Sequence, residues 1–141
     1  MNQLIAFASQ NTILVVAIIV VSLMLIHSLV GETLRGYSSI SPAESTIMIN
    51  REDALIIDVR ENNEYSEGHI INSLHIPLSS IKTRINELEK YKNKKIIVAC
   101  RSGHRSASAC ATLKKEGFEQ IFNLSGGVMA WSNASLPLVK K

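Results

Sequence analysis

The chain has few cysteines, the residues that stabilise many small proteins through disulfides or bound zinc. It has only two cysteines in 141 residues and no CxxC pair, which excludes a disulfide-rich scaffold and gives no support to a structural zinc site. Its net charge of +3 is spread along the sequence rather than gathered in blocks, which gives little support to nucleic-acid binding. Hydrophobic residues make up 46%, so the chain is not globally disordered. We expect no metal, no cofactor and no nucleic-acid partner.

Charge is missing altogether from the first 31 residues. None of the 15 Lys and Arg or the 12 Asp and Glu precedes Glu32. Residues 13–30 are apolar except for two serines and one histidine, and as a helix they would rise about 27 Å, close to the hydrocarbon thickness of a bilayer. A cleaved signal peptide needs a basic start, and residues 1–10 contain no Lys or Arg. It also needs small residues at its cleavage site, and Ser28-Leu29-Val30-Gly31 fits that requirement poorly. A buried core helix rarely lacks charge over such a length. The run therefore predicts a retained transmembrane anchor.

The charges beside this run indicate its orientation and the domain boundaries. No Lys or Arg precedes it, and Arg35 follows it. Because basic flanks tend to stay in the cytoplasm, we expect a single-pass inner-membrane protein whose C-terminal domain lies in the cytoplasm. The predicted organisation is an anchor in residues 1–31, a linker in 32–40 and a globular domain in 41–139, which is long enough for one core.

After the linker, short apolar runs alternate with polar or amphipathic segments. The runs 54–59, 73–76, 95–99 and 120–124 predict strands, and the segments 43–50, 61–67, 78–88, 106–116 and 126–131 predict helices. Strands that alternate with helices imply an α/β domain with a mostly parallel central sheet flanked by helices. In such a sheet the ligand binds beyond the carboxyl ends of the strands.

Two of the predicted strands end in charged or reactive side chains. The strand 54–59 ends at Asp58-Val59-Arg60, and the strand 95–99 leads into Cys100-Arg101-Ser102-Gly103-His104-Arg105. A loop between a strand and a helix points successive backbone N–H groups inward and adds the positive end of the helix dipole. The second segment therefore predicts an anion cradle, in which the glycine permits a tight curl and the basic side chains raise the positive potential.

The two cysteines have different predicted roles. Cys100, within the cradle, should have a lowered pKa and a large thiolate fraction. The alternative is a small buried hydrophobic residue at a strand end, but this does not explain why Arg, Gly and His crowd the next five positions. Cys110 lies among alanines in the predicted helix 106–116, and we interpret it as a core residue.

At these residues the sequence resembles the single-domain rhodanese-type sulfurtransferases. The resemblance extends over about residues 38–137 and is carried by Cys100 to Ser106, Asp58-Val59-Arg60, Glu67-Gly68-His69-Ile70, His75-Ile76-Pro77, and Gly126-Gly127 with Trp131. It implies a rhodanese-like fold in which Cys100 is the persulfide carrier. It also implies that the substrate is bound by the cradle residues Arg101, Ser102, Gly103, His104 and Arg105. The N-terminal anchor resembles that of membrane-tethered members.

The resemblance implies an enzyme that takes sulfane sulfur from a small anion such as thiosulfate and passes it to a thiol acceptor. Because Cys110 is not placed to receive the sulfur, the acceptor should be another molecule, with a protein thiol near the membrane as one candidate. We interpret Asp58 and Arg60 as supporting the loop by ion pairing rather than binding substrate. Two alternatives remain open. One is a non-enzymatic module that recruits partners to the membrane. The other is a cysteine phosphatase, whose loop has five residues between Cys and Arg, whereas four separate Cys100 from Arg105.

Overall fold

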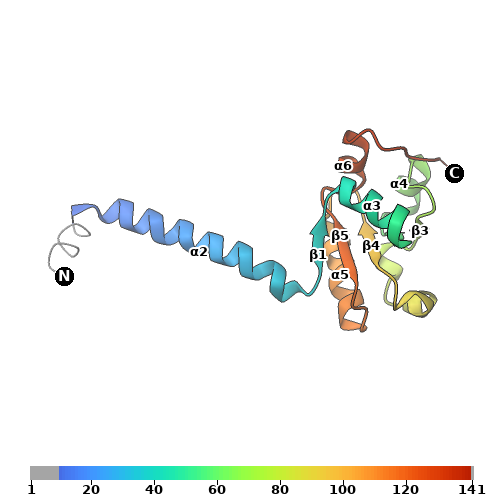
Figure 1. The fold of residues 1–141 in the computed structure, drawn as a ribbon, viewed down its shortest axis with the longest axis horizontal. Coiled ribbons are helices and arrows are strands. Elements are labelled where there is room, and N and C mark those ends of the chain that lie inside the picture. Colours follow the sequence, from blue (N-terminus) through green and yellow to red (C-terminus); the bar gives the residue numbers. More distant parts are fainter. Residues whose placement is uncertain (1–9, 141) are drawn as a thin grey trace. The chain divides into compact units, whose positions relative to one another are not determined.

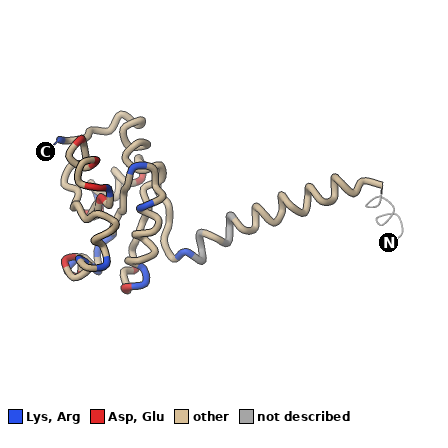
Figure 2. Tube along the Cα trace, turned by 180° about the vertical axis from the view of Figure 1, so that it is seen from behind, with Lys and Arg blue, Asp and Glu red and all other residues tan. Residues whose placement is uncertain are grey.

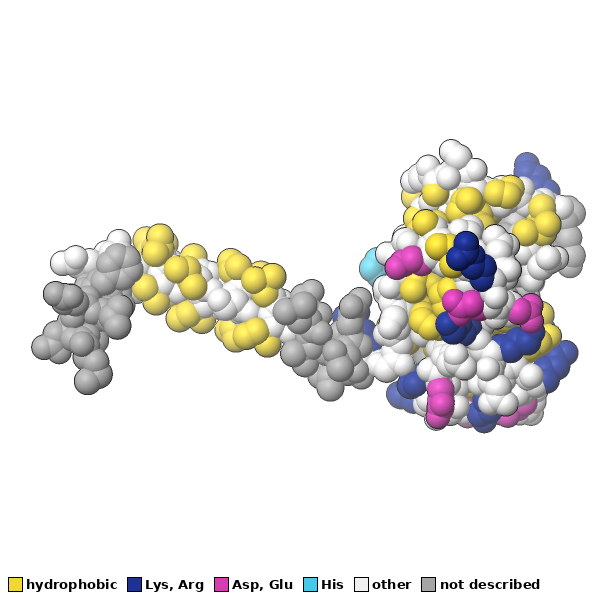
Figure 3. Space-filling model, viewed as in Figure 1, with side chains coloured by type: hydrophobic (Ala, Val, Ile, Leu, Met, Phe, Trp, Pro, Cys, Tyr) yellow, Lys and Arg dark blue, Asp and Glu magenta, His cyan; other side chains and the backbone are white. Residues whose placement is uncertain are grey.

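The computed structural model describes residues 10–140, without the side chains of residues 28–30 and 32–34. Contacts divide the chain into two units, the first ending at Arg35 and the second starting at Gly36. The first unit contains helix α2 (Thr12–Arg35) (Figure 1). Residues 12–27 of this helix carry no charged side chain (Figure 2). Large apolar side chains are exposed along residues 13–26 (Figure 3).

The predicted transmembrane anchor is not confirmed. Within the described residues, none of the helices combines the length and the apolar character that crossing a membrane requires. The predicted span of residues 13–30 includes side chains, those of 28–30, that lie outside the described residues, and so do residues 1–9 of the predicted anchor. The anchor therefore stays a prediction.

The second unit is built on a five-stranded sheet with the strand order β1-β5-β4-β2-β3 (Figure 1). Its strands are β1 (Ser38–Ile40), β2 (Leu55–Asp58), β3 (Leu74–His75), β4 (Ile96–Ala99) and β5 (Ile121–Leu124). All four pairings are parallel, which confirms the predicted α/β class and brings the carboxyl ends of the strands to one edge.

Strand β1 lies in the segment interpreted as a linker. It has three residues, and two of them are exposed serines. So short and polar a stretch carries no strand signal of its own. It becomes a strand because it pairs with β5, with Ser38 opposite Phe122 and Ile40 opposite Leu124.

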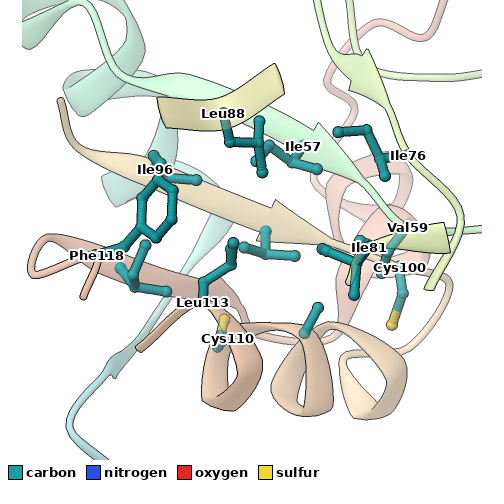
Figure 4. Close-up of a cluster of buried hydrophobic side chains, with 13 residues drawn as sticks. Ile57, Val59, Ile76, Ile81, Leu88, Ile96, Cys100, Cys110, Leu113 and Phe118 are labelled. Carbon is teal, nitrogen blue, oxygen red and sulfur yellow. The ribbon is translucent and has the colours of Figure 1, made fainter. Parts of the chain in front are cut away.

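Helices cover both faces of this sheet. They are α3 (Pro42–Glu52), α4 (Asn62–Glu67), α5 (His104–Lys115) and α6 (Gly127–Asn133), together with the 3₁₀ helices η1 (Leu78–Ser80) and η2 (Ile85–Tyr91). Successive strand residues point to opposite faces. Ile57 accordingly packs in one buried cluster with side chains of α5 and η2 (Figure 4). Its neighbour Ile56 packs in a second cluster with side chains of α3 and α6.

Local signals explain where α3 begins. The Ser41 hydroxyl accepts the N–H of Glu44 at 3.2 Å, and the Glu44 carboxylate accepts the Ser41 N–H at 2.7 Å. Pro42 follows in the first turn, where the helix needs no backbone donor. This reciprocal capping fixes the chain between β1 and the first helix of the second unit.

The segment 78–88 differs from its prediction as one amphipathic α-helix. It forms the two 3₁₀ helices η1 and η2, separated by a turn. Side chains three residues apart share a face in a 3₁₀ helix, so Leu78 with Ile81 and Ile85 with Leu88 make two separate pairs. The step of four between them falls at the break. Ile81 and Leu88 are buried as expected, so the apolar spacing predicts the burial here but not the helix type.

Candidate active site

Cys100 directly follows β4 at the carboxyl edge of the sheet, and α5 begins four residues later with Gly103 as its N-cap. Gly103 has φ +101°, in the left-handed region that favours glycine. Its N–H donates to the Cys100 Sγ with an N to Sγ distance of 3.0 Å. The Ser106 hydroxyl, in the first turn of α5, donates to the same sulfur at 3.3 Å. The loop thus curls around the sulfur and turns its donors toward it.

The surroundings of Cys100 favour its ionised form. Burial is the largest single influence and raises the pKa of the Cys100 thiol, but hydrogen bonds to the sulfur outweigh it and lower the pKa below its ordinary value. These bonds come from the Ser106 hydroxyl and from the backbone N–H groups of Ser106, Gly103 and Ser102. A lowered pKa increases the fraction of thiolate, which is the nucleophilic form, at neutral pH.

Both cysteines are buried, but their sulfurs have different surroundings. Cys110 lies in the core between α5 and the sheet, whereas Cys100 lies past the end of β4 (Figure 4). Burial, followed by the charge of Cys100, raises the pKa of Cys110 to about 12. Cys110 is therefore protonated at neutral pH, in agreement with its interpretation as a core residue.

Arg105 is paired with an acidic side chain from another helix. Its guanidinium forms a fork with Glu64 of α4, with Nη1 to Oε2 at 2.7 Å and Nη2 to Oε1 at 2.8 Å. The hydrogen bonds from Arg105 are the largest influence on Glu64 and hold the pKa of its carboxyl at about 2. Both groups are ionised at neutral pH, so their charges balance. The positive potential that the sequence predicts from Arg105 is therefore largely cancelled by Glu64.

Comparison with known proteins places this loop in a family. The model of the rhodanese-like domain matches residues 41–134. The chain belongs to the rhodanese-like domain family. The uncharacterised protein YibN of Escherichia coli K12 is 33% identical over 141 residues, which cover 99% of both chains. A sulfurtransferase of Allochromatium vinosum is 36% identical over 99 residues, covering 70% of this chain and 91% of its own. The crystal structure of a rhodanese-related protein from Thermoplasma volcanium matches with a TM-score of 0.66 at 34% identity, covering 74% of this chain and 100% of that one.

The rhodanese-like loop is the segment of residues 100–105. Three of its side chains are exposed, those of Arg101, Ser102 and His104. The backbone below them is fixed by α6, because the Val128 N–H donates to the Cys100 carbonyl at 2.8 Å and the Met129 N–H donates to the Arg101 carbonyl at 3.1 Å. The structure thus holds the main chain of the loop while leaving these three side chains accessible to a ligand.

Asp58 and Arg60 form a buried ion pair beside the rhodanese-like loop. Asp58 is fully buried and Arg60 is 6% exposed. The Arg60 Nη2 lies 2.7 Å from the Asp58 Oδ2 and also donates to the Gly68 carbonyl at 2.8 Å. The intervening Val59 donates its N–H to the carbonyl of Ala99, the residue before Cys100, at 2.9 Å. Through these bonds the pair fastens β2 and the end of α4 beside the loop.

Two residues that contact the rhodanese-like loop carry no clear signal in the sequence. Glu64 is one acidic residue in a polar helix, and nothing in its neighbourhood indicates a partner 41 positions away. Asn123 of β5 reaches the carbonyl of Gly103. Ser106, by contrast, belongs to the motif that carries the resemblance, and its place in the first turn of α5 brings its hydroxyl to the sulfur.

A pocket of about 260 Å³ adjoins the rhodanese-like loop. Its lining includes Arg101 from the loop, Glu64 and Glu67 from α4, and Val128 and Met129 from α6. Charged groups of both signs and apolar surface meet there, so the pocket can take a small polar molecule beside the loop. Among the residues that the structure describes, no group of three or more His, Cys, Asp and Glu side chains could hold a metal ion.

Proposed function

We propose that this chain is a membrane-anchored sulfurtransferase that moves sulfane sulfur from an anionic donor such as thiosulfate to a thiol acceptor, with Cys100 as the persulfide carrier. The observation that carries the proposal is the pair of donors at the Cys100 sulfur, the Gly103 N–H at 3.0 Å and the Ser106 hydroxyl at 3.3 Å. The Allochromatium vinosum relative named sulfurtransferase supports the reaction class, since the similarity covers 91% of its length.

The first half of the proposed reaction needs a thiolate and a place for negative charge. The Cys100 thiolate attacks the outer sulfur of thiosulfate, the S–S bond of thiosulfate breaks, and sulfite leaves with the bonding electron pair. Cys100 then carries a persulfide whose terminal sulfur is negatively charged. The backbone N–H groups of the loop point toward the Cys100 sulfur, so they stabilise this charge without needing to reorganise.

The loop residues 101–105 form the donor site in this proposal. Arg101 is exposed and is the cation that meets the donor anion directly. Arg105 acts differently, since its fork with Glu64 at 2.7 and 2.8 Å fixes the first turn of α5. Gly103 and Ser102 supply backbone donors to the sulfur, and His104 is exposed at the start of α5.

The second half of the reaction passes the sulfur to another molecule. A thiolate acceptor attacks the terminal sulfur, leaves as a persulfide, and returns Cys100 to its thiolate form. Cys110 is buried, with a pKa raised to about 12, so it does not serve as the acceptor. The proposed acceptor is an external thiol, and a protein thiol near the membrane fits the proposed location.

The anchor is supported by three observations. Residues 13–30 lack charge, and large apolar side chains on residues 13–26 of α2 are exposed. The similarity to the Escherichia coli relative covers 99% of both chains, so it includes the N-terminal segment. Because Arg35 follows the run, we place the rhodanese-like domain in the cytoplasm and the protein in the inner membrane.

Three experiments test the function, the membrane attachment and the orientation separately. Intact mass spectrometry of the full-length protein in detergent, after thiosulfate treatment, should show one added sulfur on Cys100 that is absent from Cys100→Ser and present in Cys110→Ala. An unchanged mass of the unsubstituted protein would contradict the transferase. For the location, membranes washed with alkaline carbonate should retain the protein, and protease added to intact spheroplasts should spare its C-terminal domain. Release by carbonate would contradict the anchor, and digestion would reverse its orientation.

A further inference from the structure

Asn123 interrupts the apolar pattern of β5 on the face that packs against α5. Ile121 belongs to the cluster beneath α5, whereas Phe122 and Leu124 belong to the opposite cluster. Because strand residues alternate between faces, Asn123 takes a position where an apolar side chain is expected. It is 7% exposed, and its Oδ1 is buried without a hydrogen-bond partner among the residues that the structure describes. A buried unpartnered acceptor costs stability, so packing does not explain an asparagine here.

The side chain of Asn123 is hydrogen-bonded to the backbone of the rhodanese-like loop. Its Nδ2 donates to the Gly103 carbonyl at 3.2 Å, and the same carbonyl accepts the first helical bond of α5 from the Ala107 N–H at 3.2 Å. The opposite orientation of the amide would place Oδ1 against the carbonyl, and two acceptors cannot bond. The donor must therefore face Gly103. Gly103 in turn donates its own N–H to the Cys100 sulfur.

Gly103 is the residue of this loop whose backbone most needs external support. Its φ of +101° lies in a region where glycine moves with little steric restraint, and it has no side chain to hold its place. We propose that Asn123 is a positioning residue, which fixes the Gly103 carbonyl and so keeps the Gly103 N–H directed at the Cys100 sulfur. The proposal rests on the proposed function only in taking Cys100 as the reacting group.

Two variants of Asn123 test this role in the full-length protein in detergent. Asn123→Leu keeps the shape of the side chain and removes the donor. Asn123→Asp keeps the volume and replaces the donor with an acceptor. Ile121→Val is the matched control, because it trims the same face of β5 and leaves the bond to Gly103 in place. The rate of Cys100 alkylation by iodoacetamide is measured from pH 5 to pH 10, and stability is measured by urea unfolding.

Loss of the Asn123 donor should weaken the Gly103 bond and raise the pKa of Cys100. We expect alkylation of both Asn123 variants at pH 7 to be roughly fivefold slower. Asn123→Leu should be as stable as the unsubstituted protein or more so, because its unpartnered Oδ1 is gone. Ile121→Val should show the reverse, with lower stability and an unchanged alkylation profile. This reactivity measures the sulfur's environment whether or not the protein transfers sulfur, so failure of the proposed function would be seen separately, as absent persulfide in mass spectrometry.

The proposal is overturned if folded Asn123→Leu and Asn123→Asp are alkylated with the original profile, or if Ile121→Val slows alkylation equally. If neither Asn123 variant folds, a measurement on the unsubstituted protein tests the proposal instead. Its Asn123 side-chain amide resonances, followed by NMR, should shift with the same midpoint pH as Cys100 alkylation. Resonances that stay constant through that midpoint would overturn the proposal.

Discussion

Gly127 is the position where one added methyl group should disturb the rhodanese-like loop most. It has φ +59°, and a Cβ built there would lie 2.3 Å from the Cys100 carbonyl oxygen and 2.6 Å from the carbonyl carbon and oxygen of Arg101. The left-handed backbone alone costs a non-glycine residue about 1–2 kcal/mol, and overpacking adds about 1–3 kcal/mol. Gly127→Ala should therefore lower the free energy of unfolding by about 2–5 kcal/mol. It should also displace Cys100, because the added methyl group would clash with backbone atoms of Cys100 and Arg101, which cannot move aside as the end of a flexible side chain can.

Gly117→Ala is the matched control. Gly117 also has a positive φ, +85°, but a Cβ there would meet only the tip of the Lys92 side chain at 3.5 Å, which can move away. We expect this variant to lose only the backbone contribution, about 1–2 kcal/mol, and to accept sulfur from thiosulfate at the original rate.

Both variants can be compared in urea by the fluorescence of Trp131, which is the single tryptophan of the chain and is 4% exposed. The rate of persulfide formation is measured alongside by mass spectrometry. Gly127→Ala should be the less stable variant and the slower one. Equal losses of stability and equal rates in the two variants would refute the view that the close approach to Cys100 is what requires glycine at this position.

The remaining predictions concern the thiols, the loop and the acid response. Cys100→Ser should abolish thiosulfate turnover, whereas Cys110→Ala should retain most of it and lose about 1 kcal/mol of stability in urea; loss of turnover in both folded variants would show that the core cysteine takes part. Insertion of one residue after Gly103 should widen the cradle and lower sulfur transfer to cyanide, and the unsubstituted protein should not turn over an aryl phosphate; phosphatase activity that equals sulfur transfer and disappears in Cys100→Ser would contradict this assignment. The Glu64 carboxyl has a pKa of about 2 in the folded chain, below its ordinary 4.5, so its stabilisation is present above pH 4.5 and is lost as the pH falls toward 2. Glu64→Gln should therefore remove this part of the acid-induced loss of stability, and parallel stability curves for the two proteins over that range would contradict the pairing.

The position of the site is predictable from the sequence because its main residues are consecutive. The buried strand β4 is an uninterrupted apolar run, and such a run in a parallel sheet ends at the ligand-binding edge. Cys100 and Gly103 follow it directly, and the geometry of a helix start then accounts for the donors at the sulfur. Local periodicity and chain order are sufficient for this part of the structure.

The groups that adjust the loop come from elsewhere in the fold and are not predictable in the same way. Glu64 meets Arg105 only because α4 and α5 lie beside the same edge of the sheet. Asn123 meets Gly103 only because β5 pairs with β4, with Asn123 opposite Val98. The edge strand β1 depends on β5 in the same manner. Each of these contacts is a property of the assembled sheet, and no local pattern of residues specifies it.

The depth of Cys110 determines how this protein withstands oxidants. Peroxide converts a thiolate into a sulfenic acid. If a neighbouring thiol then condenses with the sulfenic acid to a disulfide, with loss of water, the sulfur is protected from further, irreversible oxidation. The chain has only two cysteines, and Cys110 is fully buried with a pKa raised to about 12, so it offers no such protection while α5 stays packed. Rescue of an oxidised Cys100 must come from a thiol in solution or on another protein. The proposed acceptor is a molecule of the same kind, so repair and turnover would draw on one external thiol pool and fail together when that pool is oxidised.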